Sequence, residues 1–138
     1  MVTQAQKDQL AAYFATQPIE VVYVFGSQTT GKTRTDSDID VGVLFKEGVS
    51  QSDRFDLKLK FMSRVGTIAD FPDNVDVVDL EQAPIALQYS ALASREVIVA
   101  NDRQRQVGFE SEVMSRYFDE AYFIKQNTLY SLASIARM

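Results

Sequence analysis

The 138-residue chain lacks two side chains on which much enzyme chemistry depends, because it contains no histidine and no cysteine. Without histidine it has no imidazole general base, no Ser-His-Asp triad and none of the ligands typical of zinc sites. Without cysteine it has no disulfide, no thiolate nucleophile and no thiolate metal ligand. Catalysis by this chain must therefore use carboxylates, hydroxyls, Lys, Arg, Tyr and a hard metal ion.

Long hydrophobic runs and a signal sequence are also absent. No uninterrupted apolar stretch approaches the roughly 20 residues of a membrane helix, so we expect no membrane partner. The opening MVTQAQKDQLAAYF has neither a basic leader nor a hydrophobic signal core, which predicts a cytoplasmic protein. The net charge of −5 argues against direct nucleic-acid binding, which usually requires a basic surface.

The order of hydrophobic patterns predicts a single α+β (mixed α/β) domain over residues 1–138, with about four strands flanked by helices. Runs of β-branched and aromatic residues predict strands at 20–25, 38–45, 74–80 and 95–100, the last of them a short edge strand. Helices are expected at about 3–16, 52–68 and 84–94, followed by a long C-terminal helix over about 102–136.

Particular residues support these helices. Thr3 is a suitable N-cap for the first helix, whose apolar side carries Leu10, Tyr13 and Phe14. Proline is favoured at the first position of a helix, which predicts that Pro84 begins the third one. The apolar face of the second helix is expected to consist of residues at helical spacing: Phe55, Leu59, Met62 and Val65.

The stretch VFGSQTTGKTRTDSDIDVGVLF, residues 24–45, fits two different nucleotide-binding patterns. Read as Gly26-x4-Gly31-Lys32-Thr33, it is a Walker A motif. A Walker A loop works by leading directly into a helix, whose N-terminus holds the phosphates. Here only RTDS separates GKT from a strand-like segment, so the required helix is missing and the Walker A interpretation is disfavoured.

Read instead as Gly26-Ser27-x10-Asp38-x-Asp40, the same stretch places a turn and two carboxylates around strand ends. Residues two apart in a strand point to the same face, so Asp38 and Asp40 project together while Ile39 faces the core. Two adjacent carboxylates repel each other unless a cation lies between them, and Mg²⁺ suits such oxygen ligands.

A neighbouring strand, NVDVVDL, offers a third carboxylate. Asp76 is the better candidate, because Asp79 lies three residues further and therefore on the opposite face. Gly26 and Ser27 provide a turn without a Cβ and a hydroxyl where a triphosphate can approach the backbone. Each of these residues also has a purely structural interpretation, as a strand-ending turn or a solvated charge at a strand edge.

The motif Gly-Ser-x10-Asp-x-Asp followed by a later strand Asp resembles the DNA polymerase β-type nucleotidyltransferase superfamily. Within it, the chain is similar to the minimal nucleotidyltransferases, the MNT (MntA-type) antitoxins that are partners of HEPN (HepT-type) toxins. The segments APIALQYSALASREVIVAND and FESEVMSRYFDEAYF also resemble this family. The resemblance covers most of the chain and implies a polymerase β-like nucleotidyltransferase fold.

The resemblance also implies a function: Mg²⁺-dependent transfer of AMP from ATP to a tyrosine hydroxyl of a HEPN ribonuclease toxin, which silences it. Asp38, Asp40 and Asp76 would act as catalytic residues and metal ligands, with two ions expected. The triphosphate would lie on Gly26 and Ser27, and Lys32 and Arg34 are candidates for further phosphate contacts.

Two other functions remain open. One is an antitoxin that covers its toxin without chemistry, and the other is a nucleotidyltransferase that modifies a small molecule such as an antibiotic. The C-terminal helix bears on this choice, because its aromatic residues occupy more than one face. Core packing accounts for some of them and a protein–protein contact for the excess, among Phe109, Tyr117, Phe118, Tyr122, Phe123 and Tyr130.

Overall fold

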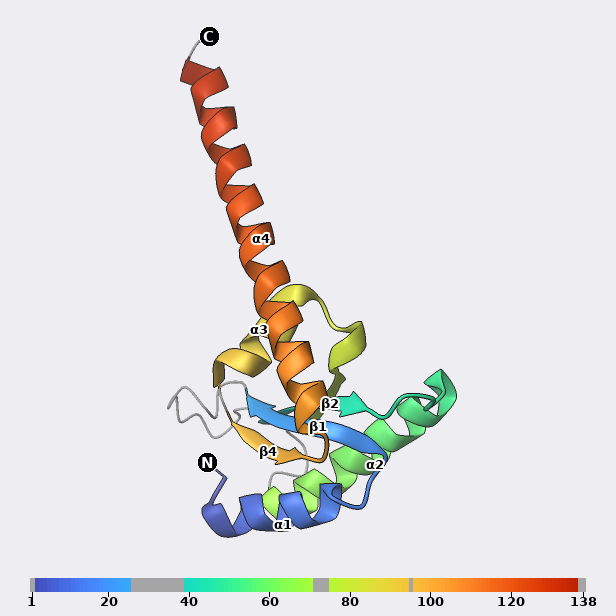
Figure 1. Cartoon of the computed structure of the whole chain (residues 1–138). Helices are drawn as coiled ribbons and strands as arrows, with labels where there is room; N and C mark the ends of the chain where they lie inside the picture. Colours follow the sequence, from blue (N-terminus) through green and yellow to red (C-terminus); the bar gives the residue numbers. More distant parts are fainter. Residues whose placement is uncertain (1, 26–38, 71–74, 95, 137–138) are drawn as a thin grey trace.

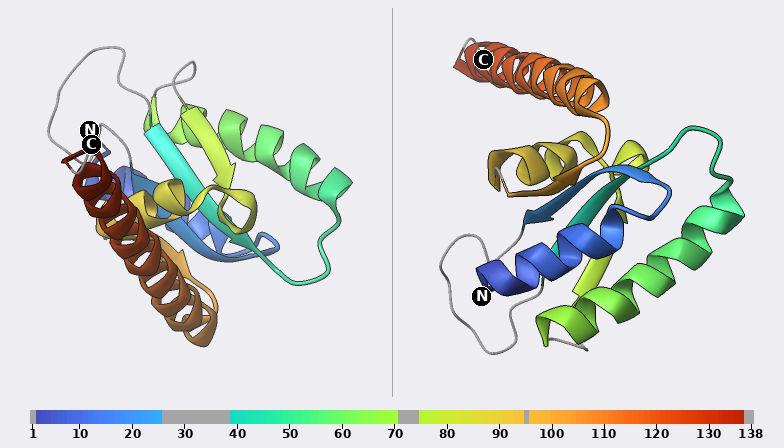
Figure 2. Two further views of the ribbon diagram at one scale, coloured as in Figure 1. Left: turned by 90° about the horizontal axis from the view of Figure 1, so that it is seen from above. Right: turned by 60° about the horizontal axis from the view of Figure 1, so that its bottom comes forward.

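The computed structural model describes residues 2–25, 39–70, 75–94 and 96–136, with the side chains of 94, 130, 131 and 134–136 also outside the description. Over this part of the chain a four-stranded sheet has the order β3-β2-β1-β4. Helices cover both of its faces (Figures 1 and 2). The expected mixed α/β architecture with a long C-terminal helix is confirmed.

The strands are β1 (Ile19–Phe25), β2 (Ile39–Phe45), β3 (Val75–Asp79) and β4 (Val97–Ala100). β1 pairs antiparallel with both β2 and β4, whereas β2 and β3 are parallel. The parallel pair needs a crossover connection, which α2 (Gln51–Ala69) provides. β4 lies at one edge of the sheet, as expected, and β3 lies at the other.

One face of the sheet packs against α1 (Gln4–Phe14) and α2. Thr3 caps α1 as expected, since its hydroxyl accepts from the Gln6 backbone N–H at 3.1 Å. Leu10 and Phe14 of α1 are buried against the sheet, and Tyr13 packs beside them. The core on this side is formed by the alternating residues of the central strands and the two helices: Val22, Val24, Ile39, Val41, Val43, Phe45, Val77, Phe61, Val65 and Ala69.

The apolar face of α2 is only partly the one expected. Val65 is buried and Met62 partly buried, but Phe55 and Leu59 are exposed by 62% and 53%. Phe61 takes the central place instead, packed against Phe14 and Phe45 with ring centroids 5.0 and 6.2 Å away. The first turns of α2 do meet the sheet, but with another side: Arg54 lies over the Phe45 ring at 5.2 Å and Leu57 packs against the core. Phe55 and Leu59 are therefore left on the exposed side of the helix.

The opposite face packs against α3 (Ile85–Ser94) and α4 (Arg103–Ala136). α3 begins at Ile85, so Pro84 precedes the helix rather than occupying its first position, and its carbonyl accepts from the Leu87 and Gln88 N–H groups. Between β3 and α3 lies a short 3-10 helix, η1 (Leu80–Gln82). Gly42 of β2 allows Leu80 to approach, because an added Cβ would lie 2.9 Å from Leu80 Cδ1.

The long helix α4 is anchored at one end only. Phe109 and Val113 are buried against β1 and α3, and Tyr117 stacks on Tyr89 of α3 with centroids 3.8 Å apart. The C-terminal part of the helix rises away from the body of the molecule (Figure 1). No helix in the described ranges is long and apolar enough to cross a membrane.

Candidate active site

Two of the predicted site carboxylates meet at one end of the sheet. Asp40 of β2 and Asp76 of β3 are register partners in the parallel ladder. Register partners point to the same face, and adjacent strands lie about 4.8 Å apart, so the two side chains are neighbours. Asp76 is exposed and Asp40 is half-buried, which leaves the pair accessible from solvent.

The packing of β2 fixes this orientation. Ile39, Val41 and Val43 are buried in the core against α1 and α2, so Asp40 points to the α3/α4 face, as the period of two predicts. Phe25, the last residue of β1, pairs with Asp40. The end of β1, after which Gly26 and Ser27 follow in the sequence, therefore lies directly beside the carboxylates.

The other predicted site residues lie outside the described residues: Gly26, Ser27, Lys32, Arg34 and Asp38. In the remaining parts of the chain no group of three potential metal ligands comes together. The pair formed by Asp40 and Asp76 provides only carboxylate oxygens, the ligand type that Mg²⁺ prefers. The donor set therefore fits a hard divalent cation.

Asp79 has a structural role instead, on the opposite face of β3 as expected. It is buried, and its Oδ2 accepts from Arg54 Nη1 at 3.0 Å and from Gln82 Nε2 at 2.9 Å. Its Oδ1 accepts from the Glu81 backbone N–H at 3.2 Å, which caps η1. Asp79 thus joins α2 to η1 and does not contribute to the site.

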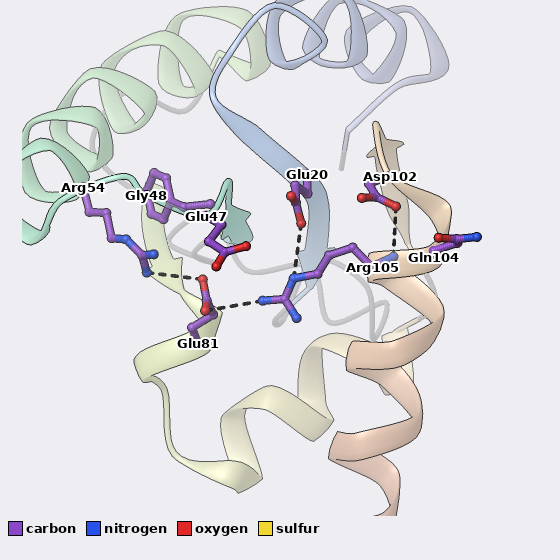
Figure 3. Close-up of a pocket in the computed structure, with 9 residues that line it drawn as sticks. Glu20, Glu47, Gly48, Arg54, Glu81, Asp102, Gln104 and Arg105 are labelled. Atoms are coloured by element: carbon purple, nitrogen blue, oxygen red, sulfur yellow. Dashed lines mark hydrogen bonds and ion pairs between the residues drawn. The ribbon is translucent and has the colours of Figure 1, made fainter.

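A charged pocket of about 610 Å³ lies at the other end of the strands, between Phe45 and the start of α4. Arg105 lies between Glu20 and Glu81, with N–O distances of 3.2 and 3.4 Å (Figure 3). Arg54 also reaches Glu81, at 3.3 Å. The paired charges tie the start of α4 to β1, η1 and α2, far along the strands from Asp40.

A second pocket, of about 400 Å³, lies between α3 and α4 on the same face as Asp40. At its floor the Tyr23 hydroxyl donates to Glu110 Oε2 at 2.9 Å. Burial and the neighbouring Glu110 carboxylate raise the pKa of Tyr23 well above its usual value, so Tyr23 remains a donor. We call it the interhelical pocket; its lining includes Tyr23, Tyr89, Val97, Gln106, Glu110 and Met114.

No local sequence pattern singles out Glu110. It lies 87 residues from Tyr23, within a helix that carries several other acidic residues. Only the packing of α4 over β1 distinguishes it from exposed neighbours such as Glu112.

The aromatic residues of α4 divide as the sequence indicated. Phe109 is buried and Tyr117 is stacked on Tyr89, so these two serve the core. Phe118, Tyr122 and Phe123 are exposed by 52%, 66% and 64%, and the Tyr130 side chain lies outside the description. Together with neighbouring aliphatic residues they form an outer apolar surface, defined as Phe118, Tyr122, Phe123, Ile124, Leu129 and Leu132.

Comparison with known proteins assigns the chain to a family. Residues 8–104 match the family model described as polymerase beta, nucleotidyltransferase. That range spans β1 to β4 and includes both Asp40 and Asp76. The chain belongs to the polymerase beta nucleotidyltransferase family. A search among curated proteins gave no match.

Solved structures share the fold. A protein described as a minimal nucleotidyltransferase is 30% identical over 70% of this chain and 90% of its own, with a TM-score of 0.51. A toxin–antitoxin structure with AMP-PNP is 22% identical, covering 92% of this chain and 99% of that chain, with a TM-score of 0.61. A complex of a tri-AMPylated HEPN toxin from Shewanella oneidensis with an MNT antitoxin is 20% identical over 91% and 98%, with a TM-score of 0.58.

Proposed function

We propose that this chain is an antitoxin that acts as a Mg²⁺-dependent protein adenylyltransferase on a cognate HEPN ribonuclease toxin. The observation that carries this proposal is the register pairing of Asp40 and Asp76 beside the end of β1, in a nucleotidyltransferase fold. The structural neighbours support the details, since one is a toxin–antitoxin structure with AMP-PNP and another contains an AMPylated HEPN toxin.

Each site residue has a proposed role. Asp40 and Asp76, together with Asp38, hold one or two Mg²⁺ ions. Bound Mg²⁺ neutralises phosphate charge and lowers the pKa of an acceptor hydroxyl. The backbone and hydroxyl at Gly26 and Ser27 bind the triphosphate of ATP, and the cationic side chains that follow, Lys32 and Arg34, add phosphate contacts.

The transfer needs no histidine. The acceptor tyrosine oxygen attacks the α-phosphorus of ATP, and the bond from that phosphorus to the bridging oxygen of the β-phosphate breaks. Pyrophosphate leaves with the electron pair of the broken bond, and the carboxylate of Asp76 accepts the proton of the tyrosine hydroxyl. Catalysis then consists of positioning and charge stabilisation, which two carboxylates fixed on adjacent strands are suited to provide.

The outer apolar surface of α4 supports a protein as the acceptor. Its residues are each exposed by more than half, on a segment that projects from the body (Figure 1). Exposed apolar clusters of this kind are typical of protein–protein interfaces. We assign this surface to binding of the toxin.

The direct test is label transfer from α-labelled ATP to the toxin encoded beside this chain. Asp40→Asn and Asp76→Asn should each lower the rate by about 100-fold or more, because a charge that stabilises the transition state is lost. Asp56→Asn, on the exposed side of α2, is the matched control. Undiminished labelling by the Asp40 and Asp76 variants would reject the assignment of these residues.

A second candidate function is toxin binding without chemistry, which the exposed surface of α4 also favours. The two functions differ in what Asp40→Asn does to cells that express the toxin. If toxicity returns, although the variant still binds the toxin, transfer is the basis of neutralisation. If the variant protects cells at equal expression, coverage of the toxin is sufficient.

A further inference from the structure

The interhelical pocket has no role in the function proposed so far, and its residue Tyr23 lies on the same face of the sheet as Asp40. Tyr23 at its floor pairs with Gly42, two residues along β2 from Asp40, and all three lie on one face of the sheet. Strand geometry puts the α carbons of Tyr23 and Asp40 about 8 Å apart. A ribose and its 5′ phosphate span a comparable distance.

The pocket has the size and chemistry of a small-molecule site. Its volume of about 400 Å³ falls within the ~300–1,000 Å³ common for such sites. Tyr89 supplies an aromatic wall, held in place by its stacking on Tyr117 at 3.8 Å. Val97 of β4 adds an apolar wall, and Gln106 adds an amide with both a donor and an acceptor.

Glu110 is the distinctive polar group of this pocket. Its Oε2 accepts from Tyr23, which fixes the carboxylate against the sheet at 2.9 Å. An ionised carboxylate can only accept hydrogen bonds, so its other oxygen selects a ligand that carries a donor. The 6-amino group of adenine is such a donor, whereas guanine has a carbonyl oxygen at that position and carries its donors at N1 and at the 2-amino group.

We infer that the interhelical pocket binds the base of the nucleotide and that Glu110 selects adenine through its amino group. This inference rests on the proposed function, because the phosphates must lie at Asp40 and Asp76 for the base to reach the pocket. Tyr23 is then a positioning residue, which holds Glu110, and Tyr89 is the ring beside which the base lies. The structure thereby links α4, which carries the toxin-binding surface, to the choice of nucleotide.

The test compares the binding of ATP, GTP and inorganic tripolyphosphate to the full chain by calorimetry, in the presence of Mg²⁺. Wild-type protein should prefer ATP to GTP. Glu110→Gln should weaken ATP binding by about tenfold, since an acceptor with full charge is lost, and should reduce the preference over GTP because an amide can donate to the guanine carbonyl. Tripolyphosphate should bind both proteins equally.

A pocket-filling variant gives a second, independent measurement. Ala93 of α3 is exposed and lines the pocket, so Ala93→Phe should exclude the base without disturbing the core. The matched controls are Ala86→Phe on the same helix and Glu112→Gln on α4, both at exposed positions. Thermal unfolding of each variant verifies that it is folded.

The results separate this inference from the function on which it rests. If Glu110→Gln and Ala93→Phe bind ATP as tightly as wild type, with the same preference over GTP, the base site is wrong. Loss of label transfer in Asp40→Asn would then still support the enzyme. If both variants weaken ATP selectively while Asp40→Asn transfers label normally, the base site stands and the catalytic assignment fails.

Discussion

Asp40 on β2 and Asp76 on β3 are register partners in a parallel ladder, at the end of the sheet where β1 also ends. Successive side chains of a strand point to opposite faces of the sheet, so the neighbouring residues Val41 and Val77 are buried in the core on the other face. Two like charges are therefore held side by side by the backbone itself. Because the fold imposes this repulsion, a cation at the site should stabilise the protein.

Addition of Mg²⁺ or Mn²⁺ is expected to raise the midpoint of thermal unfolding. At a free-ion concentration ten times the dissociation constant the gain is about 1.4 kcal/mol, or roughly 3–6 °C for a domain of this size. Asp40→Asn and Asp76→Asn should largely remove the shift, whereas Asp56→Asn should keep it. Equal shifts in all four proteins, measured by scanning calorimetry with and without the ion, would place the cation elsewhere.

Removal of the Arg54 side chain should destabilise the fold without touching the active site. Arg54→Ala leaves the Asp79 carboxylate, which is only 8% exposed, without its guanidinium partner. The expected cost is about 2–3 kcal/mol in the free energy of unfolding, measured by urea denaturation. Arg103→Ala, at the exposed start of α4, is the control and should cost little. A similar small effect for both would show that the buried pair contributes nothing.

The hydrogen bond from Tyr23 to Glu110 predicts a dependence of stability on alkaline pH. The pKa of Tyr23 is raised above the ordinary tyrosine value of 10.0 by burial and by the Glu110 carboxylate, so the folded state retains a proton that the unfolded state loses. The stabilisation is complete below pH 10 and is lost as the pH rises beyond it. Tyr23→Phe should cost about 1 kcal/mol at neutral pH and should weaken this decline.

Tyr122→Phe is the control for that measurement, because Tyr122 is exposed on the projecting part of α4. It should follow the wild-type profile of unfolding free energy between pH 8 and pH 11, a range chosen about the ordinary tyrosine pKa of roughly 10. Identical profiles for Tyr23→Phe and wild type would show that Tyr23 does not couple folding to this titration.

Substitutions in the buried part and in the projecting part of α4 should have opposite effects on stability and on toxin binding. Combined replacement of Tyr122, Phe123 and Leu129 by Ser should leave the unfolding free energy nearly unchanged but weaken binding to the toxin, measured by calorimetry or gel filtration. Phe109→Ala should instead cost about 3–5 kcal/mol, because Phe109 is buried between α4 and the sheet. Unweakened toxin binding by the triple variant would exclude the outer apolar surface as the interface.

Local patterns were sufficient to predict the strands and the orientation of Asp76 and Asp79, because a period of two is set by the backbone alone. The same reasoning was wrong for Phe55 and Leu59, because another apolar stripe at helical spacing faces the sheet instead: Leu57, Phe61, Val65 and Ile68. It also misplaced Pro84 by one residue, since proline is acceptable on either side of a helix start. These errors arise because the local sequence of a helix does not determine which of its sides packs against the rest of the fold.

The interhelical pocket was beyond prediction for a related reason. It depends on how α4 crosses β1, and the contact between Tyr23 and Glu110 joins residues 87 positions apart. A tyrosine in a strand and a glutamate in a helix are common, and nothing near either residue indicates that they meet.

Contact between α4 and α3 ends at about Phe118, whose ring packs edge-on against Tyr89. Residues before that point are constrained because they pack in the core, whereas those after it are constrained only by the partner they bind. The sequence of these distal turns can consequently change during evolution without preventing the chain from folding. Under the proposed function, one small scaffold can in this way serve many mutually exclusive toxin–antitoxin pairs while its chemistry stays the same.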